Sequence, residues 1–386
     1  MIPYGRQDIN EADLEAVRQV LLSDFLTQGP QVPAFEAAVR NYCSAQYAFA
    51  MNSATSALHV ACMAMGLKEG GLLWTSPVSF VASSNCALYC GAEVDFVDVD
   101  AATYNMSADA LRQKLEAAKA AGKLPDIVVP VHLCGQSCDM RAIHELSKQY
   151  GFKVIEDASH AIGAKYLGKP VGSCEYSDIT IFSFHPVKIV TSAEGGMLMT
   201  NDAKIAERVE LLRSHGITRN PELMQSESEG PWYYEQIDLG YNYRMTELQG
   251  ALGLSQMSRL DAFVARRHEI KTTYDAALAA LPVQIPYQDT DAHSSLHLYV
   301  VRLDLDRCKH SHRETFELLR KKGIGVNLHY MPIYRQPYYK QFGFSKDDFP
   351  NAEHYYKEAI SLPMFPTLTA ADQQAVIDAL AEVTTR

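Results

Sequence analysis

The 386-residue sequence predicts an α/β protein with a large domain built on a mostly parallel, mixed sheet and a small C-terminal α/β domain. Three observations predict it. Strand-like and helix-like segments alternate between residues 47 and 157, an apolar hairpin follows, and the pattern then changes to a long helix with short strands. Alternation of this kind favours a parallel sheet covered by helices on both faces. We expect the domains to span residues 1–255 and 256–386.

The N-terminal half supplies most of the expected sheet. Short apolar runs rich in β-branched and aromatic residues predict strands, and longer runs with apolar residues three and four apart predict helices. The first helix, over residues 10–23, is expected to carry Leu14, Val17, Leu21 and Leu22 on its apolar face. The other expected helices are 31–42, 57–65, 81–89, 108–121 and 140–150, and the expected strands are 47–51, 72–76, 94–97, 126–133 and 153–155.

The C-terminal half begins with the hairpin, whose expected strands are 178–184 and 196–200. A polar segment with two prolines and a glycine, residues 216–239, is expected to be a long surface loop. Helices are expected at 203–214, 247–260, 312–322 and from residue 369, strands at 296–303 and 326–330, and an aromatic, proline-rich connection at 331–349.

Composition limits the classes of function. The net charge of -11 argues against nucleic acid and anionic membranes as partners. No apolar run reaches the ~18 residues of a transmembrane helix, and no signal peptide precedes the first helical pattern, so we expect a cytoplasmic protein. The eight cysteines lack the paired spacing of a zinc site, which predicts reduced cysteines in the core and no metal.

One lysine, Lys188, lies in the polar turn of the hairpin. A lysine on a hairpin is usually an ordinary surface residue. Here Pro186 stiffens the approach, Ser183 and His185 crowd the turn, and both flanking strands are apolar. An amine held between core strands can be desolvated, which lowers its pKa. That is what a Schiff-base lysine requires.

Three further candidates follow expected strands, where parallel sheets bind ligands. Residues 52–56, NSATS, run into an apolar helix and fit either an ordinary capped helix or a phosphate site on its first-turn amides. Phe80 fits either a core residue or a platform for an aromatic cofactor. Asp157 fits either a turn-capping residue or a carboxylate that pairs with a buried protonated ring nitrogen.

Together these segments resemble a known family of enzymes. The matching motifs are NSATSAL (52–58), EDASHAIGA (156–164), FSFHPVK (182–188), EGGM (194–197) and GYNYRMTELQGALG (240–253). They are similar to those of the fold-type I, pyridoxal-phosphate-dependent aminotransferases. More narrowly, they resemble the nucleotide-sugar aminotransferases of the DegT/DnrJ/EryC1/StrS family. The resemblance extends over nearly the whole chain and implies a fold-type I large domain, a small C-terminal domain and pyridoxal 5′-phosphate (PLP) as cofactor.

The resemblance also implies roles for the residues nearest the cofactor ring. Lys188 would carry PLP as an internal aldimine and later shuttle a proton. Asp157 would keep the pyridine nitrogen protonated, so that the ring acts as an electron sink. Phe80 would stack on the ring, and His160, where many relatives have Gln, would lie near the ring oxygen.

Further roles by resemblance concern the phosphate and the substrate. Cofactor phosphate contacts would come from Ala54, Thr55 and Ser183, and from Asn242 of the neighbouring subunit. That last contact implies a homodimer with shared active sites. Substrate contacts are expected from His185 and, across the subunit interface, from Arg244, His329 and Tyr330.

Within the family, residues 74–92 and 328–366 are most similar to the transaminases of the pseudaminic acid pathway. This implies a UDP-linked 4-keto sugar as substrate and L-glutamate as amino donor. Alternatives remain open: UDP-4-keto-arabinose, a dTDP-4-keto-6-deoxyhexose, or a non-catalytic PLP-binding sensor. A PLP-dependent sugar dehydrase is disfavoured, because those relatives carry histidine in place of Lys188.

Overall fold

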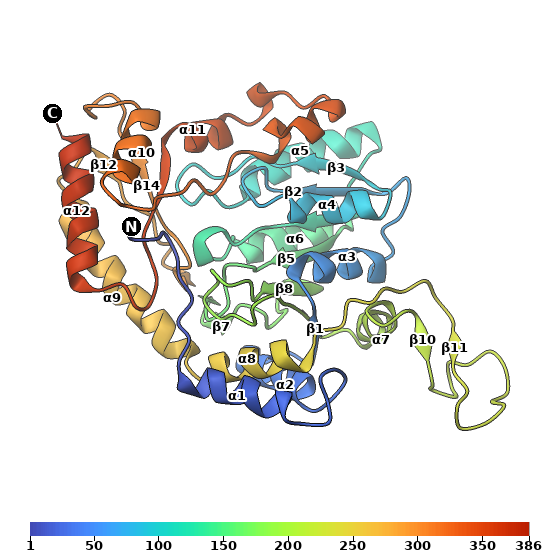
Figure 1. Cartoon of the computed structure of the whole chain (residues 1–386). Coiled ribbons are helices and arrows are strands. Elements are labelled where there is room, and N and C mark those ends of the chain that lie inside the picture. Colours follow the sequence, from blue (N-terminus) through green and yellow to red (C-terminus); the bar gives the residue numbers. More distant parts are fainter. Residues whose placement is uncertain (386) are drawn as a thin grey trace.

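A seven-stranded sheet forms the centre of the protein in this computed structural model, which describes residues 1–385 (Figure 1). The strand order is β1-β9-β8-β5-β4-β2-β3. Only β9 in this sheet runs antiparallel to its neighbours, so the sheet is mixed and mostly parallel, as expected. The strands are β1 (Tyr47–Met51), β2 (Leu72–Thr75), β3 (Glu93–Phe96), β4 (Ile127–Val129), β5 (Lys153–Asp157), β8 (Ile179–Ser183) and β9 (Gly196–Thr200).

Helices cover both faces of this sheet, and side chains alternate between the two faces along each strand. On β5, Ile155 packs with the helices of one face and Val154 with those of the other. The first face is covered by α3 (Ala54–Ala64), α4 (Ala82–Tyr89) and α7 (Ala203–Leu212). The second is covered by α2 (Gln31–Cys43), α5 (Ala108–Ala121) and α6 (Met140–Tyr150). The prediction of helices on both faces is confirmed.

The first helix, α1 (Glu11–Leu21), packs against α8 (Glu247–Met257) in an orientation that the sequence did not predict. Leu14, Leu21 and Leu22 were expected on a core-facing side, but they are 55%, 60% and 69% exposed. Asp13 is buried instead, because Arg259 Nη2 and Gln256 Nε2 donate hydrogen bonds to its carboxylate at 2.6 and 2.7 Å. These polar contacts turn the apolar side of α1 outward.

The C-terminal part contains a small antiparallel sheet in the order β12-β14-β15. The expected strand at 326–330 is wrong: this segment makes one bridge, between Asn327 and Ser361 of β15, and is not a strand of the β12-β14-β15 sheet. The domain boundary at residue 255 stays a prediction. The elements here are α9 (Leu260–Leu278), β12 (Val283–Gln284), β14 (Tyr299–Leu303), α10 (His312–Lys321), α11 (Pro350–Glu358), β15 (Ala359–Leu362) and α12 (Ala370–Thr384).

Several short elements complete the chain. The expected strand 126–133 is shorter than predicted, because β4 ends at Val129 and a 3-10 turn, η1 (Leu133–Gly135), follows. The polar segment 216–239 projects away from the sheet, and two short strands pair at its base (Figure 1). The remaining elements are β6 (Lys165–Tyr166), β7 (Lys169–Pro170), β10 (Ile217–Thr218), β11 (Glu235–Gln236), β13 (Ala292–His293), η2 (Ile333–Arg335), η3 (Pro337–Phe342) and η4 (Lys346–Asp348).

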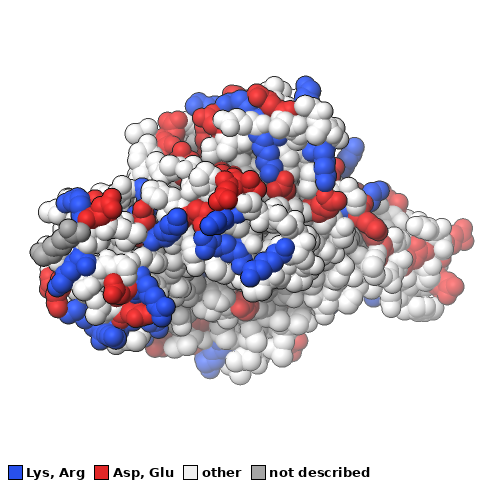
Figure 2. All heavy atoms as spheres, turned by 90° about the horizontal axis from the view of Figure 1, so that it is seen from above, with Lys and Arg blue, Asp and Glu red and all other residues white. Residues whose placement is uncertain are grey.

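The surface carries charges of both signs. On the face shown in Figure 2, acidic and basic side chains are interspersed. Within residues 1–385, no helix is both long enough and apolar enough to cross a membrane.

Candidate active site

Lys188 lies at the carboxyl edge of the large sheet, in the turn between β8 and β9. Its backbone N–H donates to the His185 carbonyl at 2.9 Å, which closes the turn. Burial of the amine lowers the pKa of Lys188 from 10.5 to about 8, although the nearby charge of Asp157 acts in the opposite direction. A substantial fraction of this amine is therefore unprotonated slightly above neutral pH.

Asp157 ends β5 and is 4% exposed. Ser83 on α4 donates its hydroxyl to Oδ2 at 2.6 Å, and the backbone N–H of Ser159 donates to Oδ1 at 3.1 Å. Each carboxylate oxygen thus holds one donor and keeps a further lone pair. A carboxylate held in this way can accept a charge-assisted hydrogen bond from a protonated ring nitrogen.

Aromatic side chains form one wall of the site. The Phe80 ring is 59% exposed and lies 6.4 Å from the Tyr330 ring, centroid to centroid. The core interpretation of Phe80 is therefore wrong, and its role as a platform stays a prediction. Tyr330 Oη lies 3.2 Å from Nε2 of His160, a buried side chain. Burial, together with the charges of Lys188 and His329, holds the pKa of His160 well below its usual value.

The start of α3 forms a cradle of amide groups. Ser53 caps the helix by accepting a hydrogen bond from Ser56 N–H at 3.1 Å, which leaves the first-turn amides of Ala54 and Thr55 pointing out of the helix end. A Cβ on Gly196 would lie 2.5 Å from the Ala54 nitrogen, so only glycine permits this approach of β9 to α3. Ser183 is paired with Gly196 in the β8–β9 ladder. The structure therefore brings Ala54, Thr55 and Ser183 together in an arrangement suited to a phosphate.

Asn242 and Arg244 lie beside the same helix end, where Asn52 contacts the Asn242 backbone and Arg244 forms a backbone bridge with Met51. Asn242 is exposed, and its carbonyl accepts a hydrogen bond from Asn52 Nδ2 at 3.4 Å. Arg244 Nη1 donates to Ser214 Oγ at 2.9 Å. No contact of either side chain with Lys188 is found among residues 1–385.

His329 and His185 differ in their surroundings. Both ring nitrogens of His329 are engaged, Nδ1 with Ser361 Oγ at 2.8 Å and Nε2 with Asn327 Nδ2 at 3.2 Å. Burial and the charge of Lys188 lower the pKa of His329 to about 4. His185 is exposed, and its Nε2 lies 3.9 Å from Glu194 Oε1. His329 therefore forms part of the wall beside Lys188 of its own chain, and Tyr330 does the same beside His160, so the expectation that these two residues act across the interface is wrong. His185 lies at the rim.

Three residues at the site were not predicted from the sequence. Ser83 contacts Asp157, Cys134 donates its backbone N–H to His160 Nδ1 at 3.3 Å, and the Tyr4 ring lies 5.1 Å from the His329 ring. Ser83 follows Phe80 by three residues near a helix start. This spacing could have indicated that Ser83 faces the same site as Phe80. No sequence signal indicates Tyr4, which comes from the far end of the chain.

Comparison with known families decides the class of protein. Residues 7–381 match the DegT/DnrJ/EryC1/StrS aminotransferase family, which covers nearly the whole chain. The chain belongs to this family. DegT/DnrJ/EryC1/StrS aminotransferases are PLP-dependent sugar aminotransferases, and this protein is an enzyme of that class with the expected fold.

Individual members of the DegT/DnrJ/EryC1/StrS family support this assignment. The chain is 37% identical to a UDP-4-amino-4,6-dideoxy-N-acetyl-beta-L-altrosamine transaminase of Campylobacter jejuni over 98% of this chain and 96% of the relative. It superposes on Helicobacter pylori PseC, an aminotransferase involved in the biosynthesis of pseudoaminic acid, with a TM-score of 0.89, 30% identity and coverage of 99% and 98%. A putative sugar aminotransferase of Streptococcus pneumoniae, Spr1654 in its PLP-form, gives a TM-score of 0.88, 27% identity and coverage of 99% and 98%.

The residues present fit PLP. The amine of Lys188, the buried carboxylate of Asp157 and the amides at the start of α3 offer a nucleophile, an anion for a ring nitrogen and a phosphate cradle. When bound, PLP supplies an electron sink for amine transfer. The protein must supply the anchoring, the fixed ring orientation and the proton transfers.

Proposed function

We propose that this sugar aminotransferase converts the C4 ketone of UDP-2-acetamido-2,6-dideoxy-β-L-arabino-hex-4-ulose into an amine, with L-glutamate as the donor. The product is UDP-4-amino-4,6-dideoxy-N-acetyl-β-L-altrosamine, in cytoplasmic pseudaminic acid biosynthesis. The observation that carries this proposal is the 37% identity, over 98% of the chain, to a relative named for that product. The PseC relationship supports the same pathway.

Lys188 and Asp157 carry the chemistry in this proposal. Lys188 Nζ attaches the cofactor and, once released, moves the proton to and from the carbon that gains the amine. A base with a pKa of about 8 suits this task, because it accepts and returns a proton near neutral pH. Asp157 holds the ring nitrogen, and Phe80 covers one face of the ring.

The substrate contacts are proposed to come from two subunits. Tyr330 and His329 line the site from the same chain, with His185 at the rim. Asn242 and Arg244 lack a contact with Lys188 among the described residues, and we propose that they serve the site of a partner subunit. The three exposed leucines of the first helix and the turn after it are candidates for the homodimer interface, since a soluble chain rarely leaves such side chains uncovered.

The test combines a spectrum with a substrate panel. Purified protein carrying PLP should be yellow, and glutamate should shift its absorbance to the shorter wavelength of the amine form of the cofactor. The enzyme that carries the amine form of the cofactor should then react with the proposed keto sugar, made in situ, faster than with UDP-4-keto-arabinose or a dTDP-4-keto-6-deoxyhexose. Preference for either competitor would overturn the proposed sugar substrate. A yellow protein whose absorbance does not change with any amino donor would indicate a non-catalytic PLP-binding sensor.

A further inference from the structure

The turn that follows β4 is tightly held by buried side chains. Asn105 donates its amide to the carbonyls of Gln136 and Ser137 at 3.0 and 3.1 Å, and its own oxygen accepts the Leu133 N–H at 2.9 Å. Within this turn Cys134 has a φ of 61°, which a residue other than glycine rarely adopts. The fixed turn aims the Cys134 N–H at His160.

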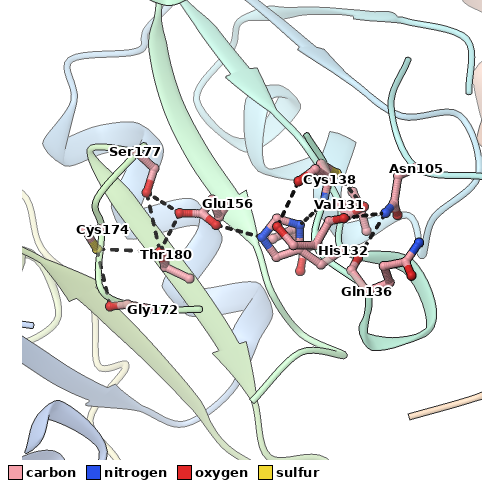
Figure 3. Close-up of polar contacts among 12 residues, drawn as sticks. Asn105, Val131, His132, Gln136, Cys138, Glu156, Gly172, Cys174, Ser177 and Thr180 are labelled. Carbon is pink, nitrogen blue, oxygen red and sulfur yellow. Dashed lines mark hydrogen bonds and ion pairs between the residues drawn. The ribbon is translucent and has the colours of Figure 1, made fainter. Parts of the chain in front are cut away.

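A second set of side chains holds the turn from the face of the sheet opposite to Asp157, and Figure 3 shows its members Glu156 and His132. Glu156 precedes Asp157 on β5 and therefore points to the other face. Its carboxylate contacts His132 Nε2 at 2.7 Å and accepts the Thr180 hydroxyl at 3.1 Å. His132 Nδ1 accepts the Cys138 N–H at 3.1 Å, so this ring carries its proton on Nε2 and donates it to Glu156. Burial would raise the pKa of Glu156, but the hydrogen bonds from His132 and the hydroxyls outweigh it and lower that pKa.

The backbone links this set of side chains directly to the reacting side. The His132 N–H donates to the Asp157 carbonyl at 3.0 Å, and the Asp157 N–H donates to the Pro130 carbonyl at 2.9 Å. His132 thus binds Glu156 and the turn through its ring, and the strand end that carries Asp157 through its backbone N–H.

The hydrogen bond from Cys134 determines which nitrogen of His160 carries the proton. A ring nitrogen that accepts an N–H must present its lone pair, so Nδ1 is unprotonated and Nε2 carries the proton of the neutral ring. The charged and titratable groups that face His160 are Lys188, His329, His297 at 4.4 Å between ring centroids, and Tyr330. None of these groups is an anion at neutral pH, so none of them favours the doubly protonated, positively charged form of the ring.

We propose that His132, Glu156 and Asn105 are positioning residues that hold the turn 133–138 so that the Cys134 amide fixes His160 as a neutral Nε2–H donor. In this form Nε2–H donates to Tyr330 Oη, and the Tyr330 hydroxyl hydrogen is directed away from His160 into the site. It is available there for an oxygen acceptor of the bound substrate or cofactor. The role for catalysis rests on the proposed function, whereas the tautomer does not.

A glutamine can present the same pair of groups, with an amide oxygen that accepts from Cys134 N–H and an amide N–H that donates to Tyr330. His160→Gln is therefore expected to retain more of the parent's kcat/KM than His160→Glu does. His160→Glu, which has an acceptor at both positions, is expected to lose about tenfold or more, the effect of one missing hydrogen bond of ordinary strength.

The direct test is ¹⁵N NMR of histidine-labelled full-length protein without added PLP, with His160 assigned by the His160→Gln variant. We expect His160 to show a protonated Nε2 and an unprotonated Nδ1, unchanged from pH 6 to 8. A protonated Nδ1, or a His160 that titrates in this range, would overturn the proposal.

The positioning residues are tested by the same spectrum. His132→Phe and Asn105→Leu should mix the two tautomers of His160, while Thr180→Val, which touches the far side of Glu156, should leave the His160 signals unchanged. A pure Nε2–H signal in both folded variants would contradict the proposal. If the unlabelled parent fails to transaminate any keto sugar but shows the expected His160 signals, the proposed function fails and the positioning network stands.

Discussion

The Ser83 hydroxyl donates a 2.6 Å hydrogen bond to Oδ2 of Asp157, and it is itself 2.7 Å from Ser79 Oγ. This contact joins α4 to the end of β5. It orients the carboxylate that is proposed to hold the cofactor ring.

Ser83→Ala should weaken PLP binding, because a hydrogen bond to a charged group contributes about 1.5–3 kcal/mol and the carboxylate loses its orientation. We expect PLP to dissociate at least about tenfold more readily from this variant, as measured by equilibrium dialysis in phosphate-free buffer. Ser84→Ala is the matched control, because Ser84 is equally buried but bonds Val81 and Tyr339. Equal losses in both variants would assign the effect to general destabilisation of α4.

The reaction of Lys188 with PLP should depend on pH with an inflection far below that of an ordinary lysine. Below about pH 8 the amine is protonated and cannot attack, so the rate of PLP attachment to the cofactor-free protein should rise to about pH 8 and then level off. Linkage gives the same sign: the folded-state pKa lies below the unfolded value, so the unfavourable contribution of Lys188 to stability diminishes between about pH 8 and 10.5. Stopped-flow absorbance checks the rate, and a rise that continues through pH 10 would contradict the lowered pKa.

Lys188→Ala should retain PLP without a covalent bond. Treatment with borohydride followed by mass spectrometry should add the mass of the cofactor to the parent chain and not to the variant, and turnover should be lost. A variant that keeps full turnover would remove Lys188 from the mechanism.

Gly196→Ala should damage the phosphate cradle, because the new Cβ would lie 2.5 Å from both the Ala54 nitrogen and the Ser53 carbonyl oxygen. Overpacking of this kind costs about 1–3 kcal/mol, and the helix start must move away from β9. We expect lower thermal stability and weaker binding of PLP, but little change in the affinity for pyridoxal, which lacks the phosphate. A similar loss for both molecules would show that the damage is not confined to the cradle.

We expect the exposed leucines of the first helix and the turn after it to form the contact between the two subunits of the dimer. Leu14→Glu combined with Leu22→Glu places charges on an apolar surface of the first helix without opening the core, since both side chains are more than half exposed. The variant should be a folded monomer by sedimentation velocity, with little activity. Leu305→Glu, a change at a leucine that is 38% exposed in the C-terminal part, is the control for an added charge. Dimers that persist in the double variant would place the interface elsewhere.

Sharing of the site can be tested independently of the interface. Lys188→Ala and Asn242→Ala subunits should each be inactive alone, and their mixture should recover part of the activity if Asn242 serves the partner's site. If verified heterodimers stay inactive, Asn242 does not serve the site of the partner subunit.

Residues whose neighbours in space are also close in the sequence were predictable from the sequence. The hairpin around Lys188 follows from two apolar runs on either side of one polar turn, and its strands differ from the prediction by only one residue at either end of β8. The orientation of α1 was not predictable, because it depends on a buried pairing of Asp13 with Arg259, 246 residues away. The network behind Asp157 was missed for the same reason: Glu156 on β5, His132 after β4 and Asn105 in the connection between β3 and α5 come together only in the folded chain.

The projecting segment 216–239 has a consequence for how the chain can be assembled. Its outer part lies beyond the β10–β11 pair, so a cut there would not break the large sheet. The two fragments would still share extensive contacts: Glu247 accepts the backbone N–H groups of Gln31 and Val32 at 2.6 and 3.2 Å, and Arg259 holds Asp13. A protease nick near Gly230 should therefore yield a two-piece protein that migrates as one species until denatured. Reconstitution from separately expressed pieces should allow isotope labelling of one half of the site at a time.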